Sequence, residues 1–165
     1  MDQTPPTATT RFLRDPDATD RLALLLSRHL GPGDTVLLEG DIGAGKTHLA
    51  RKLIQSLLSA AGKNEDVPSP TYTLVQTYDV GTFEIVHADL YRLIDPEAVL
   101  ELGLEEAFGH ALCLVEWPDR LGSRAPHEAL SITLTPEACG RRARVAGTEK
   151  HASLIRDISK AFPCD

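Results

Sequence analysis

Residues 40–47 have the sequence Gly40-Asp41-Ile42-Gly43-Ala44-Gly45-Lys46-Thr47, a complete G-x-x-x-x-G-K-[ST] pattern. Directly before it, residues 35–39 have the β-rich, apolar composition of a buried strand. Directly after it, apolar residues recur at helical spacing over residues 49–58. A strand, a glycine-rich loop and a helix in this order predict a loop that binds phosphate groups within an α/β fold.

Each residue type in this loop suits a polyphosphate. Glycines let the backbone curl so that successive N–H groups point toward an anion, which the positive end of the following helix also faces. We expect Lys46 to reach the β- and γ-phosphates and the Thr47 hydroxyl to bind Mg²⁺. The sequence predicts binding of ATP or GTP, and the lack of a guanine-specific N-K-x-D motif favours ATP. The loop residues expected to contact the nucleotide are Asp41, Gly43, Ala44, Gly45, Lys46 and Thr47.

Length and composition indicate one globular domain. The chain has 165 residues, 42% of them hydrophobic and 25% charged, and no apolar run reaches the ~20 residues that span a membrane. We expect a disordered lead over residues 1–10, without the features of a secretion signal, and a single domain over residues 11–165. Three widely spaced cysteines indicate neither a disulfide framework nor a metal site, which fits the cytoplasm.

The net charge of −7 argues against direct binding of nucleic acid, which requires a basic face. Arg141, Arg142 and Arg144 form the only tight basic cluster in the sequence. This cluster is consistent with contact to a nucleotide or RNA phosphate, and equally with a solvated edge strand. If the function involves RNA, another protein should hold most of it.

The order of the expected elements predicts a mixed sheet. Asp15-Pro16 is typical of a helix start, and the helix should end at the turn signal of residues 31–34. Residues 72–78 and 83–89 have strand composition and are separated by a short turn, so they predict an antiparallel hairpin. Short helices broken at Gly103 are then expected over residues 95–108. Strands are expected at 112–115, 130–134 and 143–146, and a last helix at 149–162. The fold predicted is a P-loop NTPase-like three-layer α/β sandwich with a mixed parallel and antiparallel central sheet.

Nucleotide hydrolysis also requires a carboxylate near the metal, and two predicted strands end in an acid. Asp89 follows residues 85–88, and Glu116 follows the wholly apolar residues 112–115. Either acid suits the Walker B position, because ligands of open α/β sheets lie beyond the carboxyl ends of parallel strands. A helix cap or a surface acid is the plainer interpretation of each.

Four further residues have two interpretations each. Ser69 and Thr71 lie where phosphate-loop proteins often have a nucleotide-sensing switch, although Ser-Pro-Thr is also an ordinary turn. Trp117 suits a cover for the nucleotide or a partner contact, and core packing as well. His87 suits catalysis, although a hydrogen-bonded structural role is commoner for such a histidine.

The chain resembles the TsaE (YjeE) family, the small ATPase of bacterial tRNA threonylcarbamoyladenosine biosynthesis, from about Thr19 to about Arg144. Besides the loop, four motifs in the family's order carry the resemblance. They are V-P-S-P-T-Y at 67–72, H-A-D-L-Y-R at 87–92, L-G at 102–103 and E-W at 116–117.

The resemblance implies a role for each matched position. Thr47 and Glu116 would hold Mg²⁺, Asp89 would act near the metal and the attacking water, and residues 69–71 would be the switch. Thr19 would lie near the adenine end of the nucleotide. Arg142 or Arg141 would match a late arginine near the nucleotide. The implied catalytic residues are Lys46, Asp89 and Glu116, and the implied cofactors are ATP and Mg²⁺.

The resemblance also implies a partner-dependent function. In the family, the ATPase is required for N6-threonylcarbamoyladenosine at adenosine 37 of tRNA, and acts by resetting a complex of TsaD and TsaB. Contact with tRNA would be indirect, through that complex. Turnover should be slow without partners, because no obvious arginine finger lies in a switch position; Arg92 is the nearest candidate, and a partner is the alternative source. Two alternatives remain at this point: a small-molecule kinase, and a module that senses nucleotide without hydrolysing it.

Overall fold

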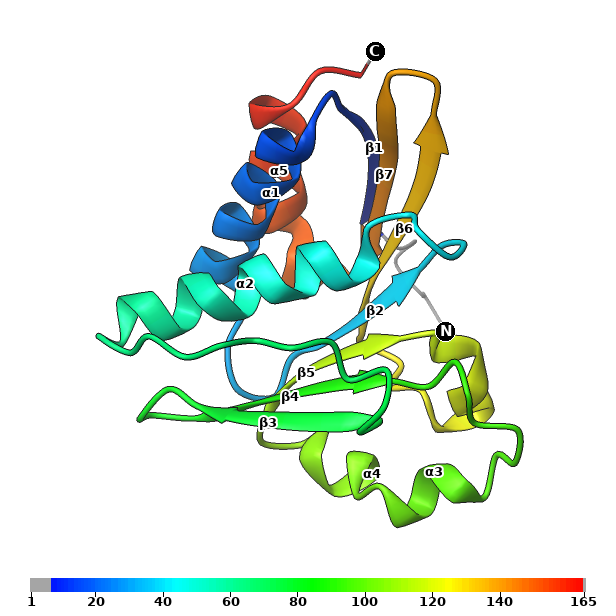
Figure 1. Cartoon of the computed structure of the whole chain (residues 1–165). Helices are drawn as coiled ribbons and strands as arrows, with labels where there is room; N and C mark the ends of the chain where they lie inside the picture. Colours follow the sequence, from blue (N-terminus) through cyan, green and yellow to red (C-terminus); the bar gives the residue numbers. More distant parts are fainter. Residues whose placement is uncertain (1–6, 165) are drawn as a thin grey trace.

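A seven-stranded sheet runs through the centre of the chain in the computed structural model, which describes residues 7–164. The strands lie in the order β1-β7-β6-β2-β5-β4-β3 (Figure 1). Their bounds are β1 Thr7–Leu13, β2 Thr35–Glu39, β3 Val75–Asp79, β4 Glu84–Asp89, β5 Leu112–Glu116, β6 Leu130–Glu137 and β7 Gly140–Gly147.

The middle of the sheet is parallel and its margins are antiparallel. β2 pairs in parallel with both β5 and β6, and β4 pairs in parallel with β5. β3 is antiparallel to β4, and β7 is antiparallel to both β6 and β1. The predicted hairpin and the predicted mixed sheet are therefore confirmed.

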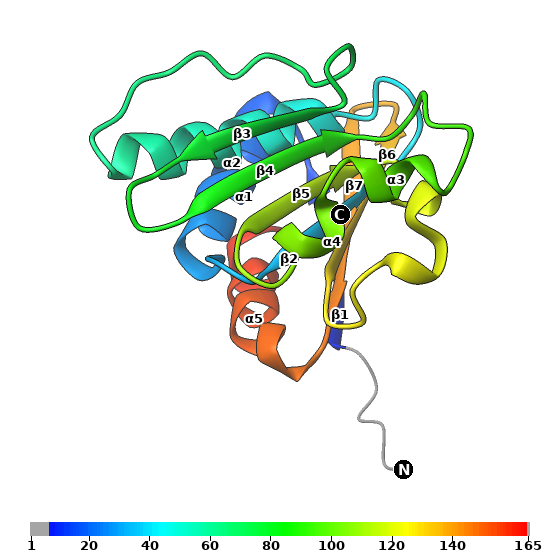
Figure 2. The ribbon, with the colours of Figure 1, turned by 90° about the horizontal axis from the view of Figure 1, so that it is seen from below.

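Helices cover both faces of this sheet, as Figures 1 and 2 show. The long helices α1 (Pro16–His29), α2 (Lys46–Ala60) and α5 (Ala152–Ala161) enclose the larger apolar core. The short helices α3 (Ala98–Glu101) and α4 (Leu104–Ala107), with the 3₁₀ segment η1 (Pro118–Arg124), enclose a smaller core on the opposite face. A short 3₁₀ turn, η2 (Glu149–His151), precedes α5. The three-layer α/β prediction is thus confirmed.

Local signals account for the elements that flank the loop. Asp15 caps α1, since its Oδ1 accepts a hydrogen bond from the N–H of Ala18 at 2.8 Å, and Pro16 occupies the first turn. β5 is buried along its whole length, as expected for a strand covered on both faces. Gly103 has a φ of 75°, a left-handed conformation that separates α3 from α4.

The N-terminal prediction is wrong for residues 7–10, which belong to β1 and not to a disordered lead. These residues form a strand because they pair with β7, far along the chain. Thr7 is in register with Gly147 and Leu13 with Arg141. The rest of that predicted lead, residues 1–6, lies outside the described residues.

Several other elements differ from the prediction: β6 and β7 are longer than the predicted strands 130–134 and 143–146, and α5 is shorter than the predicted helix 149–162. β3 begins at Val75, because the preceding residues form a turn in which the N–H of Leu74 donates to the carbonyl of Pro70 at 2.7 Å. The 3₁₀ segment η1 was not predicted. Among the described residues, none of the helices combines the length and apolar character needed to cross a membrane.

Candidate functional site

A cavity of about 370 Å³ opens at the carboxyl ends of the parallel strands β2, β4 and β5. This is the edge where ligands of α/β sheets bind, and the volume is that of a small-molecule site. Its lining residues are Ile42, Gly43, Gly45, Lys46, Thr47, His48, Thr71, Asp89, Tyr91, Glu116 and Trp117.

The glycine loop at one wall of the cavity has the left-handed turns that its sequence predicts. Gly43 and Gly45 have φ angles of 82° and 106°, which side chains other than hydrogen rarely allow. At Gly45 space is limiting as well, because an added Cβ would lie 1.7 Å from Nη1 of Arg141. That guanidinium donates to the carbonyl of Ala44 at 2.9 Å. A side chain at position 45 would therefore meet backbone strain and would also displace the guanidinium of Arg141.

Lys46 is almost fully buried, with 5% of its surface exposed. Its ammonium donates to the carbonyls of Gly40 at 2.6 Å and Asp41 at 2.9 Å, and lies 4.2 Å from the ring centroid of Trp117. Burial lowers the pKa of Lys46, and the negative charges of Glu116, Asp89 and Asp41 oppose that shift. A cation held by neutral carbonyls and short of solvation favours binding of an anion, since a phosphate would supply the missing charge.

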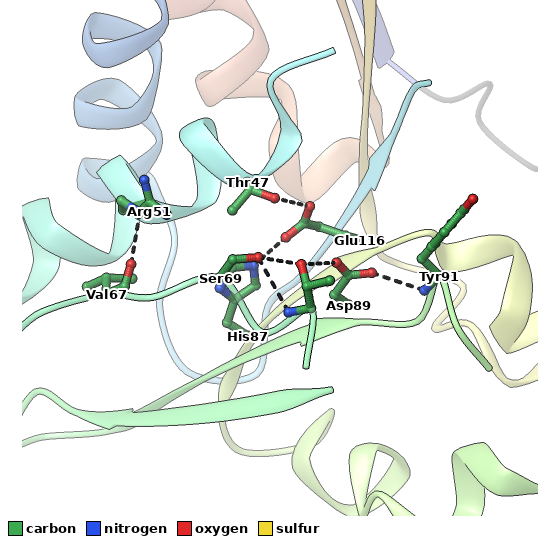
Figure 3. Close-up of polar contacts among 9 residues, drawn as sticks. Thr47, Arg51, Val67, Ser69, His87, Asp89, Tyr91 and Glu116 are labelled. Atoms are coloured by element: carbon green, nitrogen blue, oxygen red, sulfur yellow. Dashed lines mark hydrogen bonds and ion pairs between the residues drawn. The ribbon is translucent and has the colours of Figure 1, made fainter. Parts of the chain in front are cut away.

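Three side chains form a hydrogen-bonded chain from α2 into the sheet (Figure 3). The hydroxyl of Thr47 donates to Oε1 of Glu116 at 2.6 Å. Oε2 of the same carboxylate lies 2.7 Å from Nε2 of His87, in a pair that is 2% and 0% exposed. Glu116 is in register with Asp89 on the neighbouring strand, so both acids end at the same level of the sheet.

A second set of contacts joins Asp89 to the segment after α2. Thr71 donates to Oδ2 of Asp89 at 3.3 Å, and the hydroxyls of Ser69 and Thr71 are 2.6 Å apart. The other carboxylate oxygen, Oδ1, accepts the N–H of Tyr91 at 3.0 Å. Thr71 lines the cavity, whereas Ser69 lies one hydrogen bond behind it. The Ser-Pro-Thr segment is therefore a turn in which Thr71 contacts a candidate catalytic acid and Ser69 contacts Thr71.

The donor set at this point suits Mg²⁺, which prefers oxygen ligands and binds nucleotide sites through one or two carboxylates together with phosphate oxygens. The hydroxyl of Thr47 and the carboxylates of Glu116 and Asp89 supply such oxygens at one place. Within residues 7–164, no group of three or more His, Cys, Asp or Glu side chains could hold a metal alone. A metal here would need the threonine hydroxyl and the oxygens of a bound nucleotide.

Trp117 has a place in both the cavity and the core. Its ring lines the cavity beside Lys46, lies 4.9 Å from the ring of Tyr91 and packs on the smaller core. Its φ of 57° is a strained, left-handed conformation for a non-glycine residue. Such strain is typical of functional sites, and here it turns the ring toward the ammonium of Lys46.

Several predicted residues do not line the cavity, and among them Asp41 and Ala44 belong to the loop but not to the lining. Thr19 is fully buried in α1 and does not line the cavity. Arg142 donates to Glu137 and to the carbonyl of Cys164, so Arg141 is the arginine that contacts the loop. Arg92 donates to the carbonyl of Tyr72 and lies over its ring, and it does not line the cavity.

Sequence reasoning missed Ile42, His48 and Tyr91 as cavity-lining residues. His48 directly follows the loop motif, and Nε2 of its ring lies 2.7 Å from Oδ1 of Asp20 on α1. Tyr91 belongs to the same short motif as Asp89, and its side chain projects beyond the strand end in Figure 3. Their position beside recognised motif residues was the signal that was available.

This fold and this site define a P-loop-like α/β protein. A family model described as "Threonylcarbamoyl adenosine biosynthesis protein TsaE" matches residues 13–144, and the chain belongs to this TsaE family. It is 47% identical over 152 residues to the tRNA threonylcarbamoyladenosine biosynthesis protein TsaE of Rickettsia felis, covering 92% of this chain and 87% of the relative. The protein of the same name from Bacillus subtilis is 37% identical over 121 residues, or 73% of each chain.

The solved structures include a similar fold. The crystal structure of YdiB from Bacillus subtilis matches with a TM-score of 0.76 at 27% identity, covering 96% of this chain and 98% of that one. The fold and the family predicted from the sequence are both confirmed.

Proposed function

We propose that this chain is a Mg²⁺-dependent ATPase subunit required for the threonylcarbamoyladenosine modification of tRNA in the cytoplasm. Membership of the TsaE family supports the pathway. The observation that carries the ATPase is the chain of contacts from Thr47 to Glu116 and His87 beside the buried ammonium of Lys46. A hydroxyl, a carboxylate and a cation in this arrangement suit a nucleoside triphosphate with its metal ion.

In the proposed mechanism the protein mainly binds and orients. The N–H groups of the loop and the start of α2 face the phosphates, and Lys46 exchanges its two carbonyl partners for phosphate oxygens. Thr47 and Glu116 would hold Mg²⁺, which would supply positive charge to offset that of the phosphate oxygens. Asp89, held by Thr71 and by the N–H of Tyr91, orients the attacking water and accepts its proton.

The switch role of Ser69 and Thr71 follows from the same contacts. Thr71 donates to the acid that would face the water, so a change in this segment would alter the position of Asp89. Trp117 would cover the bound nucleotide beside Lys46. We therefore propose that nucleotide state is transmitted from the cavity to residues 69–71.

The proposed partners are TsaD and TsaB, with tRNA contacted only through their complex. Three apolar side chains are exposed: Ile42, which lines the cavity, is 73% exposed, Tyr72, next to the lining residue Thr71, is 84% exposed, and Ile94 is 96% exposed. Exposed apolar groups on an acidic protein support docking to another protein in preference to RNA. We expect Ile94→Glu to keep ATP binding and to weaken binding of a TsaB–TsaD complex, measured by titration calorimetry.

The deciding experiment is multiple-turnover formation of threonylcarbamoyladenosine on tRNA by TsaB–TsaD supplied with preformed threonylcarbamoyl-adenylate. Wild-type protein with ATP should sustain repeated cycles, and Lys46→Ala should stall near one. Lys52→Ala is the matched control, because Lys52 lies on the same helix but contacts Asp20 outside the cavity. If all three proteins give equal yields, the proposed role is wrong. ATP loss that depends on a small acceptor would instead indicate a kinase, and binding without turnover a sensor.

A further inference from the structure

His87 is a fully buried histidine for which the proposed mechanism has no direct task. It is 0% exposed and does not line the cavity, so it cannot touch a bound nucleotide. It lies on β4 two residues before Asp89, and alternation along a strand places both side chains on one face of the sheet. Its imidazole is therefore directed to the region beneath the two acids.

The contact with Glu116 fixes which ring nitrogen carries the proton. A carboxylate only accepts hydrogen bonds, so Nε2 of His87 donates to Oε2 of Glu116 across 2.7 Å. Nδ1 of His87 is buried and has no hydrogen-bond partner among the described residues. A buried ring nitrogen without a hydrogen-bond partner is costly, by about 1–3 kcal/mol. An apolar residue would avoid this cost, and so the histidine is best explained by the bond from Nε2.

That bond leaves a single direction for the other carboxylate oxygen. With Oε2 held from below by His87, Oε1 of Glu116 points to α2, where it accepts the hydroxyl of Thr47 at 2.6 Å (Figure 3). Oε1 of Glu116 and the hydroxyl oxygen of Thr47 are the atoms to which the proposed function assigns the metal. The imidazole thus sets the orientation of one metal ligand without touching the metal.

We propose that His87 is a positioning residue that, by donating from Nε2, holds the Glu116 carboxylate in the orientation needed to bind Mg²⁺ together with Thr47. The inference deepens the proposed function and rests on it. Partners in this position behind a metal ligand typically change metal affinity or activity by about 10–100-fold when removed. The effect should appear in metal-assisted nucleotide binding itself, before any turnover.

Two substitutions test whether the hydrogen bond to Glu116 is required at position 87, or whether any polar side chain is sufficient there. In His87→Gln the amide nitrogen takes the place of Nε2 and still donates to Glu116. In His87→Asn the shorter amide takes the place of Nδ1 and does not reach. His151→Asn is the matched control, because His151 is also buried but lies in a different cavity, with Asp34 and Lys150.

The measurement is the dissociation constant of ATP at low temperature, with Mg²⁺ and with EDTA, by titration calorimetry. We expect Mg²⁺ to tighten ATP binding to wild type, His87→Gln and His151→Asn alike. In His87→Asn that tightening should fall by about 10–100-fold, while the constant in EDTA stays unchanged. General damage to the fold would weaken both constants together, so the split between them identifies a positioning role.

The other outcomes overturn the inference. If His87→Asn keeps the full Mg²⁺ effect, His87 does not position Glu116, although nucleotide binding still stands. If wild-type protein binds no ATP, the proposed function and this inference fall together. If His87→Asn does not fold, proton–nitrogen correlation spectra of the wild-type imidazole decide. A proton on Nε2 that shifts when Mg²⁺ is added to the ATP complex supports the inference, and an Nε2 without a proton contradicts it.

Discussion

Gly45 and Gly43 offer a test of how tightly the phosphate loop is packed. Gly43→Ala places a methyl group at a φ of 82° in open space, so only backbone strain opposes it, at about 1–3 kcal/mol. Gly45→Ala adds to a similar strain a Cβ that would lie 1.7 Å from Nη1 of Arg141. The arginine must move and lose its bond to the carbonyl of Ala44, which is worth up to about 1.5–3 kcal/mol for a charged donor.

Urea unfolding of both variants, alone and with Arg141→Ala, completes a double-mutant cycle. We expect Gly45→Ala to lose more stability than Gly43→Ala, by about 1–3 kcal/mol. In the Arg141→Ala background the cost of Gly45→Ala should fall to that of Gly43→Ala. Equal costs for the two glycines in both backgrounds would refute the reasoning, since Arg141 would then not be seated on the loop.

Three further predictions concern buried polar groups. Thr19→Val should raise the free energy of unfolding, measured in urea, by about 1 kcal/mol, because the buried Thr19 hydroxyl has no hydrogen-bond partner among the described residues. A weaker affinity of this variant for ATP would instead place Thr19 in the nucleotide site. Burial raises the pKa of the Cys113 thiol to about 12, so a thiol reagent should label Cys139 and Cys164 in the native protein and spare Cys113, as mass spectrometry of the labelled chain will show. Burial lowers the pKa of His151, and the positive charge of Lys150 lowers it further. The negative charges of Asp34 and Glu128 oppose that shift. The unfolded chain therefore takes up this proton first as pH falls below about 6.5, and stability should fall there by up to about 1.4 kcal/mol per pH unit. His151→Asn should remove that part of the slope between about pH 7.5 and pH 5.5, and an unchanged slope would assign it to other groups.

Local sequence signals were sufficient for the parts of the fold that form around near neighbours. The cap at Asp15, the loop of residues 40–47 and the apolar run of β5 each carry their structure within a few residues. β1 has no such independence, since its threonines are ordered by pairing with β7 at the other end of the chain. A local sequence pattern does not show that these residues pair with a strand so far along the chain.

The site was predictable as a set of residues and not as a set of contacts. The acids at 89 and 116 could be placed at one edge because parallel strands end together. The choice between Arg141 and Arg142 depends on the register of β7, in which neighbouring side chains face opposite sides and one residue of slip exchanges them. The bond between His87 and Glu116 likewise needed the register of β4 on β5.

The pairing of β1 with β7 also has a consequence for the order in which the protein is made. Residues 7–13 are translated before the other strands of the sheet, and their partners at 141–147 follow about 7–30 s later at ordinary elongation rates. The sheet edge closes only when nearly the whole chain is available, and the N–H of Phe12 finally donates to the carbonyl of Pro163. Until then this β-prone segment stays unpaired, and a nascent chain that stalls before β7 exposes it to mispairing with its neighbours on the same message.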